Sequence, residues 1–429
     1  MSAPDKFHPI VDQSESWRAL SDCLRRIHEG PWSFIQLRGT TLSDAAIDDD
    51  DVDLLGTRES VEALVGAAFE WAKLGLCHFR IRARKENKTE LILYSSDGRH
   101  CVLFDLWISL PQIDRGRQVL EYKDSQKVLG PDEGSIRRLN LEAEVCVYVQ
   151  HLVAKRKSFQ STSVQGRLVS YRDACHVGGL ARMENLLNEL LERELVFEEA
   201  DRWTLDRLQE LLGGSLDQRK RVSVFRRLGA LLIVPPRKLC LLSIMGCDGA
   251  GKSTLADRLL GSMPRIRRVF TGKHLYRKSL LYKLAVIFIR PLTFQSRERF
   301  DELLAPLIYL RASVGLLVKW IRWRGQLTLI DRSLVDFLYL DRKTDAPHFS
   351  RSQWLMRFFG HRIPTVHCVA SYDQVHKRKD EMTRAGHDVY DGDMFRCFSS
   401  RRPTDYLCFN NNQELDEAQK ALARIIETL

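Results

Sequence analysis

The segment Leu239–Thr254 reads LCLLSIMGCDGAGKST and decides the fold of the C-terminal half of the chain. It begins with an apolar run typical of a buried strand, continues with the pattern G-x-x-x-x-G-K-S/T, and leads into an amphipathic stretch, Ser253–Leu260, that we expect to be helical. In such a unit the backbone N–H groups of the glycine-rich loop surround phosphate oxygens, and the helix N-terminus adds a partial positive charge. The segment therefore predicts a nucleotide-phosphate site.

The residues of this loop have separate expected roles. The expected nucleotide contacts within it are Gly246, Gly249, Gly251, Lys252, Ser253 and Thr254. Lys252 is expected to reach the β- and γ-phosphates and Ser253 to ligate Mg²⁺, and the loop alone does not separate a kinase from a GTPase or a motor. The alternative is a chance glycine-rich turn, but the strand before the loop and the helix after it favour phosphate binding.

A second group of candidate residues follows the apolar run Gln326–Ile330. This run is typical of a strand and ends in Asp331-Arg332-Ser333. A carboxylate at the carboxyl end of a parallel strand faces the crevice where ligands bind, so Asp331 is a candidate Mg²⁺ ligand. Arg332 is a candidate to bind the phosphate or hydroxyl of an acceptor. The alternative is an ordinary surface Asp-Arg pair.

A third candidate region is the basic segment Asp373–Met382, which we expect to be helical and to be followed by a Gly- and Asp-rich loop. Phosphoryl transfer depends on charge stabilisation, and an arginine-bearing lid that closes over the phosphates is a recurrent device. The phosphate loop itself contains no arginine. Arg378 and Arg384 are therefore the candidate catalytic arginines, and a solvated charged face is the alternative.

Strand-like and helix-like segments alternate throughout this half. The candidate strands are Leu239–Met245, Val269–Thr271, Gln326–Ile330, Thr365–Ala370 and Tyr406–Phe409. This alternation predicts an α/β fold in which a five-stranded parallel sheet carries helices on both faces. Two apolar stretches, Leu280–Ile289 and Leu303–Val318, are too short to span a bilayer and are expected to be buried helices, with contact at a membrane surface as the alternative.

These motifs together resemble the thymidylate kinase-like branch of the P-loop nucleoside and nucleotide kinases. The resemblance covers about 238–429 and implies a kinase that transfers the γ-phosphate of Mg-ATP to a nucleotide, a nucleoside or another small hydroxyl or phosphate acceptor. It also implies that Asp248 lies near this acceptor and that the loop Asn410–Gln413, including Asn411, passes the adenine. After Arg332 the chain departs from the thymidylate kinase pattern, so the resemblance does not imply dTMP as the acceptor.

The first 130 residues have a different pattern. A helix is expected over Ser14–Glu29 and another from about Ser60 to Lys73. The expected strands are Trp32–Leu37, Val52–Leu55, Cys77–Ala83, Glu90–Tyr94 and Cys101–Trp107, of which the last three form a meander. The order of elements predicts a small α+β domain.

Three carboxylates in this α+β part are arranged as two-metal sites require. Asp51 and Asp53 alternate along one strand and so share a face, and Asp105 lies on a neighbouring strand. With the turn Gly39-Thr40 before them, these residues resemble the polymerase beta-like nucleotidyltransferase superfamily, which implies that Gly39 and Thr40 hold a triphosphate and that the carboxylates hold metal. A solvated acidic loop and an inactive relative that only binds ligands are the alternatives.

The composition of the chain limits the classes of protein to which it can belong. The chain has 429 residues, 44% hydrophobic and 28% charged, which excludes a disordered or fibrous protein and predicts about three domains. We place them at 1–132 (nucleotidyltransferase-like), 133–235 (a helical connector) and 236–429 (kinase-like). Residues 236–429 contain 33 Lys or Arg against 20 Asp or Glu, which favours a polyanionic ligand there. Ten scattered cysteines and an N-terminus without a secretion signal predict a cytoplasmic protein with reduced thiols.

Two other functions remain open from the sequence. One is a nucleotide-driven regulatory ATPase or nucleic-acid-associated switch with a vestigial N-terminal site, although no nucleic-acid recognition motif accompanies the basic charge. The other is a protein that binds ligands at both sites without chemistry. The expected partner of the kinase is a small-molecule phosphate acceptor, and no transmembrane segment is expected.

Overall fold

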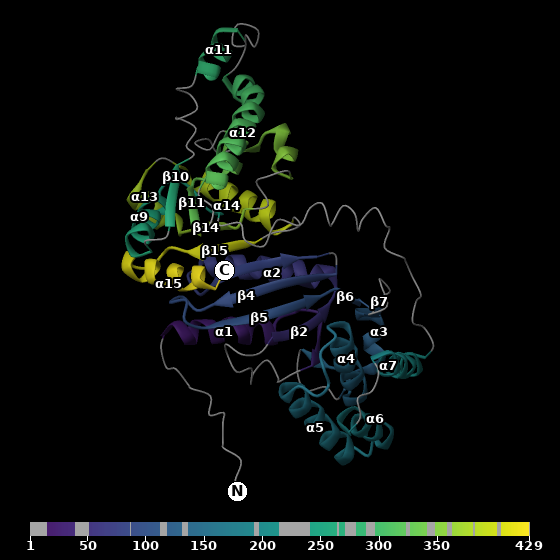
Figure 1. The fold of residues 1–429 in the computed structure, drawn as a ribbon. Coiled ribbons are helices and arrows are strands. Elements are labelled where there is room, and N and C mark those ends of the chain that lie inside the picture. Colours follow the sequence, from purple (N-terminus) through teal and green to yellow (C-terminus); the bar gives the residue numbers. More distant parts are fainter. Residues whose placement is uncertain are drawn as a thin grey trace.

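The chain folds around one large mixed β-sheet (Figure 1). The computed structural model describes residues 15–38, 51–85, 87–111, 118–130, 136–192, 197–213, 241–263, 266–270, 280–288, 297–322, 327–340, 348–357, 363–380, 382–400 and 405–428. The sheet has 11 strands in the order β10-β11-β9-β14-β15-β3-β4-β5-β2-β1-β8. Helices pack around it, so the expected α/β class is confirmed for the described part of the chain.

The C-terminal half supplies five neighbouring strands of this sheet. They are β10 (Ile266–Phe270), β11 (Leu327–Asp331), β9 (Leu241–Met245), β14 (Thr365–Val369) and β15 (Tyr406–Asn410), all parallel. The predicted parallel five-stranded arrangement is thus present, with β10 beginning earlier than expected. The first strand, β9, lies in the middle, with the second and third strands on one side and the last two on the other. The crevice at such a switch in strand order is where open α/β sheets bind ligands.

The N-terminal half supplies the other six strands. They are β1 (Phe34–Arg38), β2 (Asp51–Gly56), β3 (His78–Arg84), β4 (Lys88–Tyr94), β5 (Cys101–Trp107) and β8 (Arg137–Arg138). The predicted antiparallel meander of β3, β4 and β5 is confirmed. Helix α1 (Glu15–Glu29) and helix α2 (Arg58–Lys73) also lie where they were expected, and Thr57 caps α2 by accepting a hydrogen bond from the Ser60 amide.

The two halves meet inside the sheet. Strand β15 pairs antiparallel with β3, with Tyr406 opposite Ile81, so one hydrophobic core extends from α1 to the C-terminal helix α15 (Leu415–Glu427). The patterns in the sequence suggested one sheet in each half and gave no sign of this pairing. An ion pair fixes the junction, since the Arg80 guanidinium donates two hydrogen bonds of 2.7 Å to the Asp405 carboxylate.

A helical bundle covers the far edge of the sheet (Figure 1). It consists of α4 (Leu141–Ala154), α5 (Thr162–Val177), α6 (Ala181–Glu192) and α7 (Phe197–Leu211), which confirms the helical character expected for this region within the described residues. Its core includes Ile35 of β1 and Leu55 of β2. Short elements complete the edge: β6 (Ser109–Pro111), β7 (Gln118–Glu121), α3 (Tyr122–Ser125) and a 3₁₀ turn, η1 (Gln126–Val128). The bundle therefore packs on the sheet edge opposite the parallel strands.

Two expectations about helices in the C-terminal half were wrong. Helices α11 (Leu280–Phe288) and α12 (Arg297–Arg322) are not buried throughout, because only one face of α12 packs on the body and the other face is exposed. The predicted Gly- and Asp-rich loop is a helix, α14 (Arg384–Ser399), which Thr383 caps by accepting a hydrogen bond from the Gly386 amide. The basic segment before it is shorter than expected, α13 (Tyr372–Arg378).

Helix α12 contacts several short elements that follow β11. They are η3 (Leu334–Phe337), β12 (Tyr339–Leu340) and η4 (Arg351–Arg357), and β12 pairs with β13 (His348–Phe349).

In the part of the chain that the structure describes, no helix combines the length and apolar character needed to cross a bilayer. The nine cysteines of this part are all free thiols, and eight of them are buried.

Candidate functional site

The glycine-rich loop lies at the carboxyl end of the central strand β9 and leads into α9 (Lys252–Ser262). Gly246 has φ 152°, and a Cβ there would lie 2.4 Å from the Cys368 carbonyl oxygen of β14. Gly251 has φ 82°, and a Cβ there would lie 2.5 Å from the Asn411 side-chain amide. Both positions therefore require glycine, and they keep the loop tight at the point where α9 begins. Gly249 also has a positive φ, of 95°.

The side chain of Lys252 lies inside this loop. It is 6% exposed, and its ammonium group donates a hydrogen bond to the Cys247 carbonyl and lies 3.8 Å from the Asp248 carboxylate. Asn411, directly after β15, closes the loop from the other side, because its side-chain amide donates to the Ala250 carbonyl at 2.6 Å. Asn411 was expected to be an ATP contact, and the structure places it against the phosphate loop.

The two predicted Mg²⁺ ligands lie side by side. Ser253 is in the first turn of α9, and its hydroxyl donates to the Asp331 carboxylate, which ends β11, at 3.4 Å. Asp331 is fully buried, whereas Ser253 and the neighbouring Thr254 are exposed. Arg268 of β10 also donates to the same Asp331 oxygen. Sequence reasoning missed Arg268, since only the pairing of β10 with β11 brings it to this carboxylate.

Arg332, the next residue, combines an unusual backbone with a position beside the loop. Its φ is 78°, in the left-handed region that residues with a side chain seldom adopt, and its amide donates to the Ile244 carbonyl of β9 at 3.1 Å. Its guanidinium lies 3.6 Å from the Asp248 carboxylate. Asp248 thus bridges Lys252 and Arg332, which joins the ends of two parallel strands into one charged cluster. Strained residues of this kind gather at functional sites.

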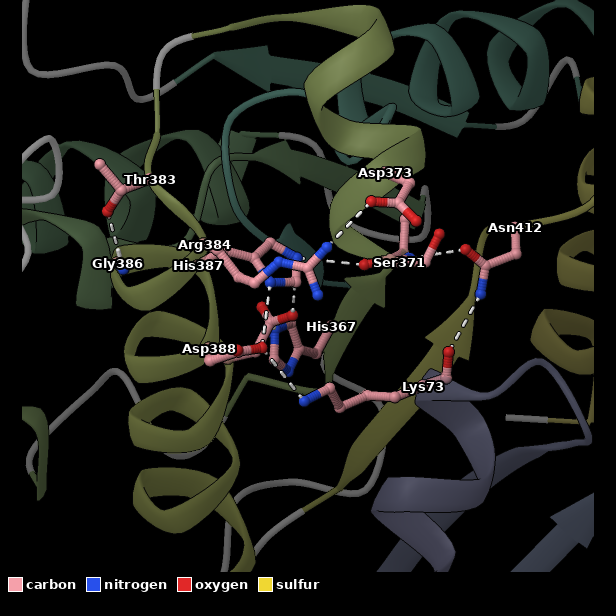
Figure 2. A network of polar contacts seen from close by, with 12 residues as sticks. Lys73, His367, Ser371, Asp373, Thr383, Arg384, Gly386, His387, Asp388 and Asn412 are labelled. Carbon is pink, nitrogen blue, oxygen red and sulfur yellow. Dashed lines mark hydrogen bonds and ion pairs between the residues drawn. The ribbon is translucent and has the colours of Figure 1, made fainter.

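Of the two candidate lid arginines, one lies at the loop. The exposed Arg378, the last residue of α13, donates to the Asn411 carbonyl at 3.4 Å, and one of its nitrogens lies 3.4 Å from where a Cβ of Gly251 would be. Arg384 instead pairs with Asp373 at 3.1 Å (Figure 2). Its guanidinium also lies over the Tyr372 ring, 4.8 Å from the ring centroid. Of the two arginines, Arg378 is therefore the one whose described contacts lie at the glycine-rich loop.

A polar network joins the segments that follow β14 and β15 to the N-terminal half (Figure 2). The Ser371 amide donates to the Asn412 side chain at 2.6 Å, and Asn412 in turn donates to the Lys73 carbonyl of α2 at 3.3 Å. The Lys73 ammonium group lies 3.5 Å from Asp388 of α14. The segments after β14 and β15, which border the phosphate loop, are thus held by α2.

His78 of β3 lies at the same junction in its neutral form. The Asn410 amide donates to its Nδ1 at 3.0 Å, so Nε2 carries the proton and donates to the Ser96 carbonyl at 2.8 Å. Its ring stacks on Phe409, with the ring centroids 4.3 Å apart. Burial lowers the pKa of His78 from 6.5 to about 4.

This shift makes stability depend on pH. The unfolded chain binds the proton near pH 6.5 and the folded chain near pH 4, so the contribution is complete above pH 6.5 and is lost as the pH falls towards 4. In the wild type, His78 is expected to lower the free energy of unfolding by about 2–3 kcal/mol between about pH 7.5 and pH 4.5. We expect His78→Gln to lack this part of the pH dependence, as measured by urea titration. The exposed His348, changed to Gln, is the matched control. An unchanged pH dependence in His78→Gln would contradict the assignment.

The N-terminal carboxylates are arranged differently from the residues around the glycine-rich loop. Asp53 of β2 lies in register with Asp105 of β5, as the sequence predicted for a shared face. Each is held by a cation of the chain: Asp53 pairs with Arg38 at 2.6 Å, and Asp105 pairs with Lys88 at 2.6 Å. Burial raises the pKa of the Asp105 carboxyl.

Of the other residues predicted for this site, the structure describes Asp51 alone. Asp51 is exposed at the start of β2, and Gly39 and Thr40 lie outside the described residues. Among the residues that the structure does describe, no group of three or more His, Cys, Asp or Glu side chains is placed to hold a metal ion. The ion pairs with Arg38 and Lys88 were not foreseen, since both partners come from neighbouring strands.

No family model matches this chain, and no curated protein matches it. The geometry of the loop between β9 and α9 is therefore the main guide to function.

Proposed function

We propose that the chain is an ATP-dependent phosphotransferase with a P-loop kinase fold, similar to thymidylate kinases, in residues 236–429. Its substrates are Mg-ATP and a small acceptor, either a nucleotide, a nucleoside or another hydroxyl or phosphate compound. The observation that carries the proposal is the position of Lys252, which is buried inside a loop of left-handed glycines at the point where the order of parallel strands switches. That arrangement suits the phosphates of a nucleotide.

The donor set beside the loop suits Mg²⁺. Ser253 and Asp331 offer a hydroxyl and a carboxylate oxygen 3.4 Å apart, and Mg²⁺ prefers oxygen ligands supplied by one or two side chains together with phosphates and water. When bound, Mg²⁺ neutralises charge on the phosphate oxygens and orients them. Arg268 donates a hydrogen bond to the same Asp331 oxygen. When the metal binds, this oxygen would have to serve both the guanidinium and the metal.

The charged side chains around the loop have complementary roles in this proposal. Lys252 binds the transferred phosphate, and Arg378 stabilises the charge that develops on it from the lid side. Arg332 lies on the other side of Asp248, and we assign it to the phosphate of the acceptor. Asp248 orients both Lys252 and Arg332, and it is placed to accept a hydrogen bond from an acceptor hydroxyl.

Asp331→Asn tests the proposed metal site. We expect transfer of γ-label from Mg-ATP to a panel of nucleosides, nucleotides and sugar phosphates to fall about 100-fold, with partial recovery as Mg²⁺ is raised, because a neutral amide binds the metal weakly. Asp416→Asn on α15 is the matched control, because Asp416 is an exposed carboxylate that pairs with the exposed Arg258. Label transfer by Asp331→Asn at the wild-type rate and Mg²⁺ dependence would sink the proposal.

For the N-terminal half the ion pairs favour ligand binding without nucleotidyl transfer. Metal-dependent transfer needs carboxylates that are available to two ions, whereas Asp53 and Asp105 are engaged by Arg38 and Lys88. Transfer of α-label from Mg-ATP that is lost in Asp53→Asn would overturn this view.

Hydrolysis of ATP without any acceptor, stimulated by nucleic acid, would instead favour the regulatory ATPase or switch. The free thiols suit a reducing compartment such as the cytoplasm.

A further inference from the structure

The exposed apolar side chains of the protein are concentrated on two helices. Among the described residues, eleven large apolar side chains are exposed, and eight of these belong to α11 and α12. They are Leu284, Ile287 and Phe288 on α11, and Leu303, Leu307, Leu310, Val314 and Val318 on α12; we call this set the α11–α12 apolar face. Exposed apolar residues that occur singly need no explanation, but a group of this size marks an interaction surface.

The spacing of the α12 residues makes them a single stripe. They follow one another at intervals of four, three, four and four residues, which is the spacing of one helix face. The opposite face, which includes Tyr309, Ala312 and Leu316, is buried against the body. The rings of Tyr282 and Phe300 meet edge to face, 6.1 Å between centroids, and join α11 to the beginning of α12. In Figure 1 both helices project from the sheet, away from the helical bundle.

The charge of this region indicates what covers the apolar face. Residues 273–325 contain 11 Lys or Arg and 3 Asp or Glu, a net charge of +8 in a chain whose total is +10. Among them Lys283, Lys319 and Arg322 are exposed on α11 and α12. A second copy of the chain would bring these like charges together, whereas an anionic surface would neutralise them.

We propose that the α11–α12 apolar face docks on the surface of an anionic lipid bilayer. Helices that lie in a membrane interface combine an exposed apolar stripe with neighbouring Lys and Arg and are not apolar enough to span. The apolar side chains enter the boundary between headgroups and acyl chains, and the basic side chains remain among the headgroups. Because α12 packs against η3, which begins three residues after Asp331, docking would hold the phosphate loop close to the bilayer.

Co-sedimentation of the full chain with lipid vesicles tests this inference without any nucleotide, so its outcome is independent of the phosphotransferase proposal. We expect the protein to sediment with vesicles of phosphatidylcholine mixed with phosphatidylserine, to remain in solution with phosphatidylcholine alone, and to be released by high salt. The double variant Val314→Glu/Val318→Glu is expected to lower the bound fraction at least ~10-fold, because both side chains would carry charge into the interface.

The matched control is Val177→Glu on α5, since Val177 is an exposed apolar residue, 89% exposed, that lies outside the α11–α12 apolar face. It is expected to bind as the wild type does. Val314 and Val318 are each 60% exposed, so both variants are expected to fold, with unchanged melting temperatures. Equal binding of the double variant and the wild type would overturn the proposal. The absence of vesicle binding would also overturn it. This holds both if sedimentation velocity shows a monomer and if it shows a dimer that the double variant dissociates.

Discussion

Lys252→Ala is expected to abolish phosphoryl transfer, with a fall in rate of at least ~1000-fold. Lys252 is 6% exposed, and its ammonium group donates a hydrogen bond to the Cys247 carbonyl inside the phosphate loop. Its removal leaves the backbone amides of the loop, which bind phosphate but supply no full positive charge to the transferring group. The measurement is γ-label transfer from Mg-ATP at saturating nucleotide, so that weaker ATP binding does not mask the effect.

Two companion variants make this result specific. Lys420→Ala removes an exposed lysine of α15 and is expected to leave the rate unchanged. Lys252→Arg keeps the charge, but its wider, planar guanidinium does not suit a loop closed by Gly246 and Gly251, so it is expected to be strongly impaired as well. A Lys252→Ala protein that transfers label within a few-fold of the wild-type rate would exclude the proposed role of the loop.

The phosphate loop could be predicted from sequence because its constraints are local. A buried strand, glycines at positions that need a left-handed backbone, and a lysine at the start of a helix all lie within sixteen residues, Leu239–Thr254. Asp331 was found for a similar reason, since it ends an apolar strand. The meander of the N-terminal half followed from alternation and turn residues. Each of these signals depends on neighbours in the chain.

What the sequence did not show depends on contacts between distant segments. Arg268 reaches Asp331 only because β10 pairs with β11, and Lys88 reaches Asp105 only because β4 pairs with β5. The left-handed backbone of Arg332 is not encoded by a glycine and could not be anticipated. Helix α14 was hidden by its glycine and aspartate residues, although the Thr383 cap was a local sign of it.

The exposure of α12 was missed for a different reason. Its stretch Leu303–Val318 contains one charged residue, Arg311, and composition does not tell which face of such a stretch has a partner. The stripe of Leu303 to Val318 and the buried stripe of Tyr309 to Leu316 are both apolar, so the sequence alone suggested burial on all sides. Only the structure shows that one of the two faces is uncovered.

Arg80→Ala is expected to lower the free energy of unfolding by about 2–3 kcal/mol, since it removes a buried guanidinium and leaves the partly exposed Asp405 carboxylate without its partner. Arg80 is 3% exposed and makes a two-pronged ion pair with Asp405 directly before β15, at the strand pair that joins the two halves of the sheet. Urea unfolding followed by circular dichroism measures the change.

Arg82→Ala provides the matched control on the same strand. Its side chain is 45% exposed and pairs with Glu90 at 2.7 Å, so its loss is expected to cost less than about 1 kcal/mol. Because the β3–β15 pair lies within one core, the wild type is expected to unfold in a single transition seen equally by probes in both halves. Equal losses for Arg80→Ala and Arg82→Ala, or two separate transitions in the wild type, would show that the joined sheet does not couple the stability of the C-terminal half to that of the N-terminal half.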